Sequence, residues 1–159
     1  MKLTTVNKKF KQGIYKPINS KKYRGNDYPR FLSSWELKLF RWCDLNEDVV
    51  EWSSEGIAIP YSNPVTEKNS TYFPDVAVKI KVGGEIKKYL IEIKPFRQTI
   101  DPKTVDHGKK RKKTILYENL NYIKNLAKWN AAKKWCIKMG YEFTILTEKE
   151  LGINKYENK

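Results

Sequence analysis

The 159-residue chain has few of the residues that build several common kinds of site. Its single histidine, His107, cannot form a two-histidine metal site, which argues against nucleases that use several histidines. Its two cysteines, Cys43 and Cys136, form no CxxC pair and are expected to be buried free thiols in a reducing compartment. No apolar run approaches the ~20 residues of a membrane-spanning helix. The N-terminus has no apolar segment typical of a signal peptide. Neither a membrane protein nor a secreted one is therefore expected.

Acidic residues are also scarce: 18 Asp and Glu face 32 Lys and Arg, which gives a formal net charge of +14. The excess lies in two segments, since residues 1–30 hold nine basic residues and one acid, and residues 103–138 hold eleven and two. A polyanion is the expected partner, and nucleic acid is the commonest one. Because 27 of the basic residues are Lys and only five are Arg, contact with the phosphate backbone is favoured over sequence reading.

The length predicts a single domain. Residues 1–30 show little periodicity and indicate an irregular basic arm, followed by a domain over residues 31–150 and a tail over 151–159. A helix is expected over residues 33–46, and short strands over 49–52 and 57–61. The apolar residues that recur at helical spacing in the first helix are Leu32, Trp35, Leu39 and Trp42.

The second half of the domain predicts two paired strands, a long basic loop, a helix and a last strand. The paired strands are expected over residues 72–82 and 86–94, joined at Gly83-Gly84. A loop over residues 96–113 precedes a helix over 115–139 and a strand over 141–147. The expected buried stripe of that helix consists of Leu116, Leu120, Ile123, Ala127 and Ala131. This order predicts a single-domain α/β fold, a mixed β-sheet flanked by helices.

The glycine turn makes a geometric prediction about two acids. If Gly83 and Gly84 form the turn, Val82 pairs with Glu85, and the same register places Asp75 opposite Glu92 on the neighbouring strand. Lys94 lies two residues after Glu92 and shares its face. Two facing carboxylates repel, so either one stays protonated or a divalent cation lies between them. Hard oxygen ligands favour Mg²⁺, and an adjacent ammonium can orient a water. The alternative is a surface salt-bridge cluster on a solvated strand.

Glu36 is a possible fourth member of this group. It lies beside the apolar stripe of the first helix and could reach the edge of the sheet. The run Ser33-Ser34-Trp35-Glu36 also fits a capping box, in which the glutamate bonds a backbone N–H at the helix start. Both roles remain open and are compatible.

These residues resemble the PD-(D/E)xK nuclease signature, with Pro74-Asp75, then Glu92-Ile93-Lys94, and Glu36 on the preceding helix. The runs YPRFLSSWE, YFPD and KKYLIEIKPFRQT resemble more closely the head completion nucleases of T-even-type tailed phages, and TnsA nucleases are similar in outline. The resemblance implies a restriction-endonuclease-like fold. It also implies a Mg²⁺-dependent endonuclease in which Mn²⁺ can substitute.

The same resemblance assigns roles to individual residues. Asp75 and Glu92 would ligate the metal with help from the Ile93 carbonyl, Lys94 would position the attacking water, and Glu36 would complete the site. Gln98 stands where some relatives carry a glutamine near the DNA. The implied setting is phage head completion after DNA packaging, with portal or neck proteins as partners, in the host cytoplasm or the virion.

Double-stranded DNA is the expected substrate, held mainly through its phosphate backbone. The candidate phosphate contacts are Lys21, Lys22, Arg24, Lys109, Lys110, Arg111, Lys112 and Lys113. The alternative function is a non-enzymatic DNA-binding or head and neck assembly protein that retains the fold.

Overall fold

The computed structural model describes residues 12–153, so the start of the predicted arm and the end of the predicted tail lie outside the described residues. Its centre is a four-stranded sheet in the order β3-β6-β7-β8. These strands are Val49–Ser54, Val76–Val82, Glu85–Ile93 and Glu142–Leu146. β3, β6 and β7 are antiparallel, whereas β8 runs parallel to β7, so the sheet is mixed as predicted.

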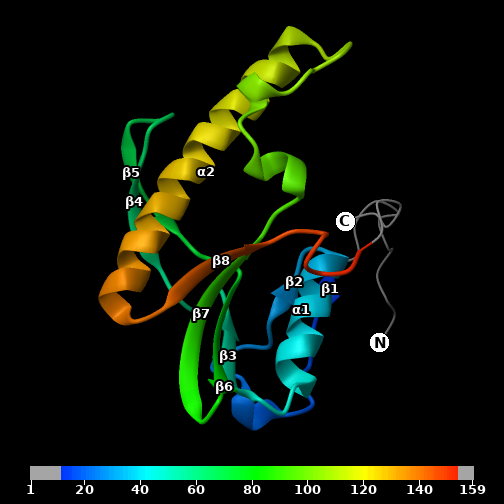
Figure 1. Cartoon of the computed structure of the whole chain (residues 1–159), viewed down its shortest axis with the longest axis vertical. Helices are drawn as coiled ribbons and strands as arrows, with labels where there is room; N and C mark the ends of the chain where they lie inside the picture. The colour runs from blue at the N-terminus through cyan, green and yellow to red at the C-terminus, as the bar shows by residue number, and fades with distance from the viewer. Residues whose placement is uncertain (1–11, 154–159) are drawn as a thin grey trace.

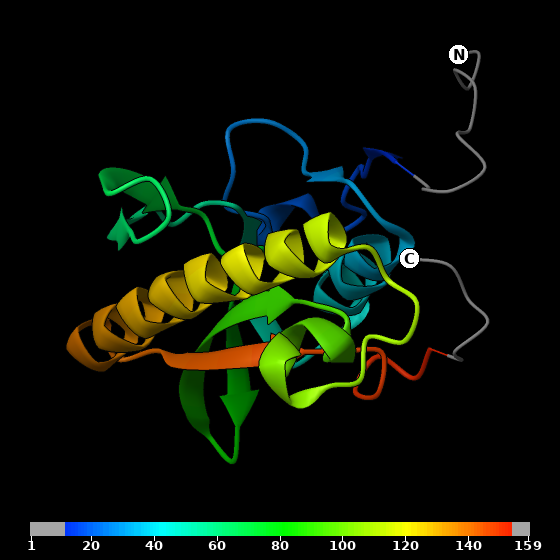
Figure 2. The same cartoon turned by 90° about the horizontal axis from the view of Figure 1, so that it is seen from above.

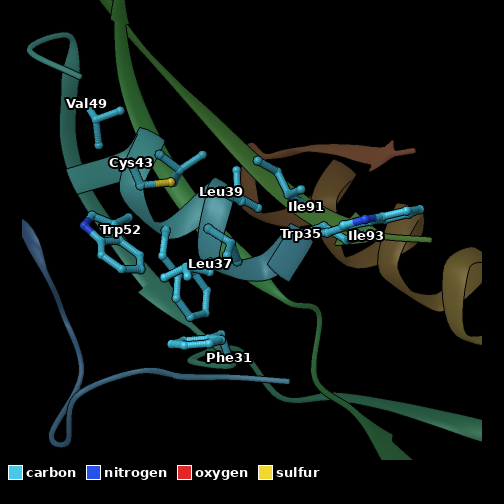
Figure 3. Packing of buried hydrophobic residues seen from close by; sticks show 12 residues of the cluster. Phe31, Trp35, Leu37, Leu39, Cys43, Val49, Trp52, Ile91 and Ile93 are labelled. Atoms are coloured by element: carbon cyan, nitrogen blue, oxygen red, sulfur yellow. The ribbon is translucent and has the colours of Figure 1, made fainter. Parts of the chain in front are cut away.

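One helix covers each face of this sheet (Figures 1 and 2). α1 (Ser34–Leu45) packs on the face that presents Val76, Val78 and Ile91. α2 (Lys112–Met139) packs on the opposite face, which presents Ala77 and Leu90. The split follows from the alternation of side chains along a strand. Figure 3 shows the larger of the two cores, in which Trp52, Cys43 and Leu39 lie between α1 and the sheet.

The segment that precedes α1 is folded onto this core from residue 12. β1 (Gly13–Ile14) pairs with β2 (Arg30–Phe31), and a 3-10 turn, η1 (Ser20–Lys22), lies between them. The centre of the Tyr23 ring lies 4.8 Å from the centre of the Trp52 ring. Asp44 of α1 is fully buried and accepts hydrogen bonds from the Tyr15 hydroxyl and from the backbone of Ile18. Residues 12–31 are thus part of the packed domain.

The prediction of one strand over residues 72–82 is wrong. The segment divides into β5 (Lys68–Tyr72), which pairs with β4 (Ile59–Asn63), and β6, which begins at Val76. Pro74 lies between them, and because proline has no backbone N–H it cannot donate to a strand ladder. The resulting bend carries Asp75 out of the strand. The register of the β6–β7 hairpin is as predicted, with Val82 opposite Glu85 and Val76 opposite Ile91.

The buried stripes of both helices differ in part from the prediction. α2 begins at Lys112, three residues early, after two 3-10 turns, η2 (Phe96–Thr99) and η3 (Pro102–Thr104), in the predicted loop. Leu116, Leu120 and Ile123 are exposed, since the N-terminal half of α2 projects beyond the sheet (Figure 1). The buried positions of α2 are Asn125, Trp129, Ala132 and Cys136.

Of the residues predicted to face the core from the first helix, Trp35 and Leu39 are buried as expected, whereas Trp42 and Leu32, which precedes α1, are about half exposed. The helix instead buries Leu37, Phe40 and Cys43, so its packed face is rotated relative to the predicted stripe. Both cysteines are free and buried, as predicted. Within residues 12–153 no helix is long and apolar enough to cross a membrane.

Candidate active site

Asp75 and Glu92 meet at the end of the sheet that the glycine turn does not occupy. The paired ladder of β6 and β7 stops at Val76 and Ile91, one position before the predicted Asp75–Glu92 pair. Asp75 instead contacts β7 through its side chain, whose Oδ2 accepts a hydrogen bond of 2.7 Å from the backbone N–H of Ile93. Glu92 lies two residues after Leu90 on β7, so the two side chains are on the same face of the sheet, which is the face that packs on α2. The hairpin register therefore brings the two acids together as expected, although not as a formal ladder pair.

The Glu92 carboxylate is held at both of its oxygens. Only 6% of the residue is exposed. Its Oε2 accepts a hydrogen bond of 2.6 Å from the hydroxyl of Tyr72, and its Oε1 lies 3.4 Å from the ammonium of Lys94. Because burying a polar group without partners is costly, these two partners offset the cost of burying the carboxyl group there. They also fix the direction in which the carboxylate points.

Asp75 lies in a less favourable environment. Burial raises the pKa of its carboxyl well above the usual value, and the negative charge of Glu92 raises it further. The N–H of Ile93 and the charge of Lys94 act in the opposite direction without cancelling the effect. An acid whose charged form is disfavoured in this way is typical of functional sites. A positive charge between Asp75 and Glu92 would relieve the repulsion.

Glu36 caps α1 and also acts on the acids. The Ser33 hydroxyl accepts a hydrogen bond of 3.2 Å from the N–H of Glu36, as a capping residue does. The Glu36 carboxylate accepts from the N–H of Leu32 at 2.5 Å, one residue before the position expected in a capping box. Its charge also contributes to the raised pKa of Asp75, so Glu36 lies close to the acidic pair. Glu36 therefore has contacts typical of a helix cap and also lies near Asp75.

The donor set suits a hard divalent cation. Asp75 and Glu92 supply carboxylate oxygens, and Ile93, the residue after Glu92, can supply its backbone carbonyl. Among the described residues, no three His, Cys, Asp or Glu side chains form a complete cation cage. A cation held by so few protein oxygens retains several waters, which is the coordination that Mg²⁺ prefers at phosphate-transfer sites.

Tyr72 is a site residue that the sequence analysis missed. Burial and the charge of Glu92 raise the pKa of its hydroxyl, so the hydroxyl stays protonated and remains a donor to Glu92. The run Tyr72-Phe73-Pro74-Asp75 contained the signal. It was obscured by placing all four residues on one strand, where Tyr72 and Asp75 would lie on opposite faces.

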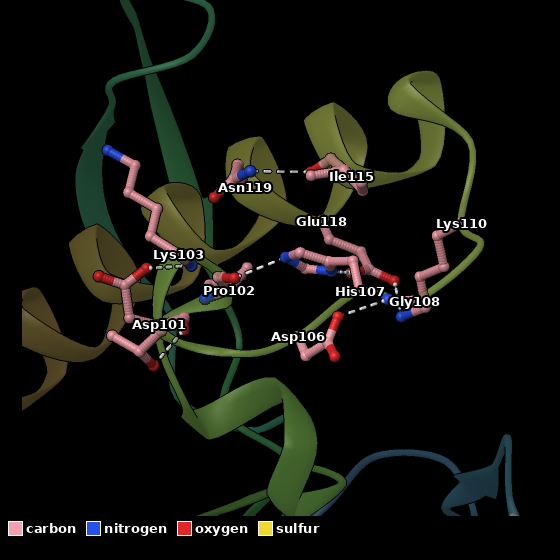
Figure 4. Close-up of polar contacts among 11 residues, drawn as sticks. Asp101, Pro102, Lys103, Asp106, His107, Gly108, Lys110, Ile115, Glu118 and Asn119 are labelled. Atoms are coloured by element: carbon pink, nitrogen blue, oxygen red, sulfur yellow. Dashed lines mark hydrogen bonds and ion pairs between the residues drawn. The ribbon is translucent and has the colours of Figure 1, made fainter.

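Gln98 lies in η2, beyond Lys94, where its N–H donates to the carbonyl of Pro95 at 2.8 Å. Its side chain lines a cavity of about 440 Å³ between this segment and α2, shared with Tyr122 and Asn125. Figure 4 shows contacts within the segment that precedes α2 and with α2 itself: a ring nitrogen of His107 lies 2.6 Å from the carbonyl oxygen of Pro102 in the same segment, and Lys110 pairs with Glu118 of α2 at 2.8 Å. The ion pair with Lys110 lowers the pKa of Glu118.

The candidate phosphate contacts lie in two different places. The ammonium of Lys22 bonds the carbonyls of Asp44 and Asn46, and Arg24 pairs with Glu51. With the exposed Lys21, they therefore lie at the end of α1 opposite Glu36, and two of them have structural partners. In the second group Lys110 is paired with Glu118. The remaining members of that group are exposed at the start of α2: Lys109, Arg111, Lys112 and Lys113.

The sequence matches a family of endonucleases described as TnsA-like endonuclease N terminal. The match spans residues 46–148, which include Asp75, Glu92 and Lys94 and begin after Glu36. Because this is more than half of the chain, the protein belongs to that endonuclease family. The resemblance drawn from the short motifs is thereby confirmed.

Beyond the family match, the chain is similar over most of its length to one particular nuclease. The chain is 36% identical over 138 residues to the head completion nuclease of Enterobacteria phage T4. The matched region covers 86% of this chain and 90% of that protein, so the similarity extends over nearly the whole of both.

Proposed function

We propose that this chain is a divalent-metal-dependent endonuclease that hydrolyses phosphodiester bonds of double-stranded DNA. The observation that carries the proposal is the convergence of Asp75 and Glu92, with Lys94 beside them, in a member of an endonuclease family. In a solvated salt-bridge cluster, neighbouring positive charges would lower the pKa of an acid. The pKa of Asp75 is instead raised by burial and by the charge of Glu92, which supports a role in chemistry.

Four residues would hold the metal: Asp75, Glu92, Glu36 and, through its carbonyl, Ile93. When bound, a divalent cation polarises a phosphoryl oxygen and favours ionisation of a water. Mg²⁺ fits the oxygen donors, and Mn²⁺ is expected to substitute. Tyr72 positions Glu92 by donating a hydrogen bond of 2.6 Å. Such supporting contacts are typical of metal sites and fix the ligand in one orientation.

Lys94 is the residue that would act on the attacking water. Its ammonium lies 3.4 Å from Glu92 and on the same face of β7, so it can donate to a water held next to the acids. It would also stabilise the charge that develops on the phosphoryl oxygens. Gln98, four residues further, would contact the DNA or the reacting group. The product implied by the family resemblance carries a 5′-phosphate.

DNA would be held by phosphate contacts from the basic segments, above all by Lys109, Arg111, Lys112 and Lys113, which are exposed at the start of α2. We further propose that the protein acts in phage head completion after DNA packaging, in the host cytoplasm or the virion, with portal or neck proteins as partners. The support for this setting is the similarity to a head completion nuclease.

The test is cleavage of supercoiled plasmid in Mg²⁺ or Mn²⁺. We expect nicking by the wild type and its loss in Asp75→Ala and in Lys94→Ala. Lys87→Ala is the matched control, because Lys87 is an exposed lysine on the same strand. Equal background in all proteins would contradict the proposal. It would favour the alternative, a non-enzymatic DNA-binding or assembly protein that retains the fold.

A further inference from the structure

A second lysine, Lys128 of α2, lies over the ring of Tyr72, which is bonded to the acidic pair through Glu92. The C-terminal half of this helix packs on the sheet through Trp129, Ala132 and Cys136, in one core with Tyr72 and Leu90. Lys128 immediately precedes the buried Trp129, so its backbone is held in place where α2 crosses Tyr72. Its ammonium lies 5.5 Å from the centre of the Tyr72 ring. The hydroxyl of that same ring bonds Glu92.

No carboxylate pairs with Lys128 in the part of the chain that the structure describes: the ion pairs of residues 12–153 involve other lysines. Burial lowers the pKa of its ammonium, and the positive charges of Lys124 and Lys94 lower it further. Glu92 and Asp75 act in the opposite direction without reversing the effect. Lys128 is therefore a partly buried cation that makes no ion pair within residues 12–153 and that the charges of Lys124 and Lys94 affect more than those of Glu92 and Asp75.

Such an arrangement costs folding free energy, because burying a charge without a partner is unfavourable. A surface lysine avoids this cost by extending into water. Attraction between the ammonium and the Tyr72 ring offsets this cost only in part. An anion that enters between Lys128, Lys124 and Lys94 would remove the repulsion among the three. A DNA strand that reaches the acidic pair necessarily brings its phosphates to this place.

We propose that Lys128 binds a phosphate of the cleaved DNA strand next to the scissile one. This inference rests on the proposed function, and it extends the binding surface from the exposed start of α2 to the centre of the helix. Lys124 precedes Lys128 by four residues and thus lies on the same face. The charges of Lys124 and Lys94 both act on Lys128, so one phosphate near Lys128 would interact favourably with all three cations.

Binding of duplex DNA should be measured by fluorescence anisotropy in EDTA, so that no cleavage occurs, over a series of salt concentrations. Lys128→Gln is expected to weaken binding about tenfold, as loss of a charged hydrogen bond does. It should also reduce the slope of log K against log salt by about 0.9, the value for one phosphate contact. Lys128→Arg keeps the charge and should restore both quantities.

Lys133→Gln is the matched control. Lys133 is exposed on the same helix, turned about 140° away from Lys128. We expect its affinity to remain within about twofold of the wild type, well below the loss of one charged contact. A Lys128→Gln protein with the wild-type slope would overturn the proposal, as would an equal change in Lys133→Gln. If Lys128 only covers the Tyr72 ring, Lys128→Gln lowers the melting temperature and leaves the slope unchanged, which also overturns it.

The binding measurement separates this inference from the proposed function. A wild type that fails to nick plasmid in Mg²⁺ or Mn²⁺ but shows the expected Lys128 slope would overturn the nuclease mechanism alone. In cleavage under single turnover, Lys128→Gln should raise the enzyme concentration for half-maximal rate about tenfold, in step with its weaker binding. The maximal rate should change far less, because the contact lies beside the reacting phosphate.

Discussion

Two aspartates of this protein, Asp75 and Asp44, should respond to the same substitution in opposite ways. Asp75→Asn removes a carboxylate whose charge is disfavoured, whereas Asp44→Asn removes one whose charge is stabilised. An asparagine at position 75 can still accept the 2.7 Å hydrogen bond from Ile93, and its amide would replace repulsion of Glu92 with a possible donor. In metal-free buffer we therefore expect Asp75→Asn to be more stable than the wild type.

The pH dependence of this gain follows from the direction of the shift. Burial and the charge of Glu92 raise the pKa of Asp75 in the folded chain above its unfolded value of about 3.9. The unfolded chain therefore releases this proton first, and the wild type loses stability as pH rises from about 4 through the folded pKa. Each unit of pKa elevation corresponds to about 1.4 kcal/mol. In a chain of this size that is about 3–5 °C in melting temperature.

Asp44 is the matched control. Burial alone would raise the pKa of its carboxyl, but hydrogen bonds from Tyr15, Ile18 and Asn19 outweigh burial and lower it. Its charge therefore stabilises the fold above the unfolded pKa, and that contribution is lost as pH falls through the folded pKa. Asp44→Asn leaves a buried donor without an acceptor, which costs about 1–3 kcal/mol.

Thermal unfolding from pH 4 to 8 in EDTA tests both expectations. The melting temperature of Asp75→Asn should exceed that of the wild type at pH 8 and approach it at pH 4, whereas Asp44→Asn should melt lower at pH 8. Adding Mn²⁺ should stabilise the wild type far more than Asp75→Asn, since a ligand stabilises the state that binds it. If Asp75→Asn melts below the wild type at pH 8, as Asp44→Asn does, Asp75 is a structural carboxylate and the reasoning is wrong.

Three further predictions concern the residues around the acids. Ser33→Ala should cost about 1 kcal/mol of stability with little loss of cleavage. Glu36→Gln keeps an acceptor for the N–H of Leu32, so it should reduce cleavage with a smaller change in melting temperature. If Glu36→Gln instead lowers the melting temperature and leaves cleavage unchanged, Glu36 is a helix cap alone. Tyr72→Phe should raise the Mn²⁺ concentration for half-maximal cleavage about 10- to 100-fold, and an unchanged metal dependence would deny Tyr72 its positioning role. In urea unfolding, Trp129→Ala should cost about 3–5 kcal/mol and Leu116→Ala less than about 0.5 kcal/mol; equal costs would contradict the packing of α2.

Local rules predicted the hairpin well, because its register depends on a few adjacent residues. Gly83 and Gly84 both adopt positive φ, as a two-residue hairpin turn requires, and this fixes the pairing of every residue from Val76 to Ile91. The approach of Asp75 to Glu92 follows from that pairing. The cap at Ser33 is equally local, since its partner is three residues away.

Contacts between distant segments were harder to predict. The spacing of Leu116, Leu120 and Ile123 indicates a helix face, but periodicity does not tell which part of a long helix overlaps the sheet. The position of Lys128 over the Tyr72 ring follows from that overlap and was therefore not foreseen. β5 was missed because Lys68–Tyr72 carries little apolar pattern, and it pairs only with β4.

A crystal of the protein soaked in Mn²⁺, with data collected near the manganese absorption edge, tests the shared cation site most directly. We expect a strong anomalous peak within coordination distance of carboxylate oxygens from both Asp75 and Glu92, and its absence in Asp75→Asn crystals treated in the same way. A wild-type crystal saturated with Mn²⁺ that shows no density between these two side chains would contradict it.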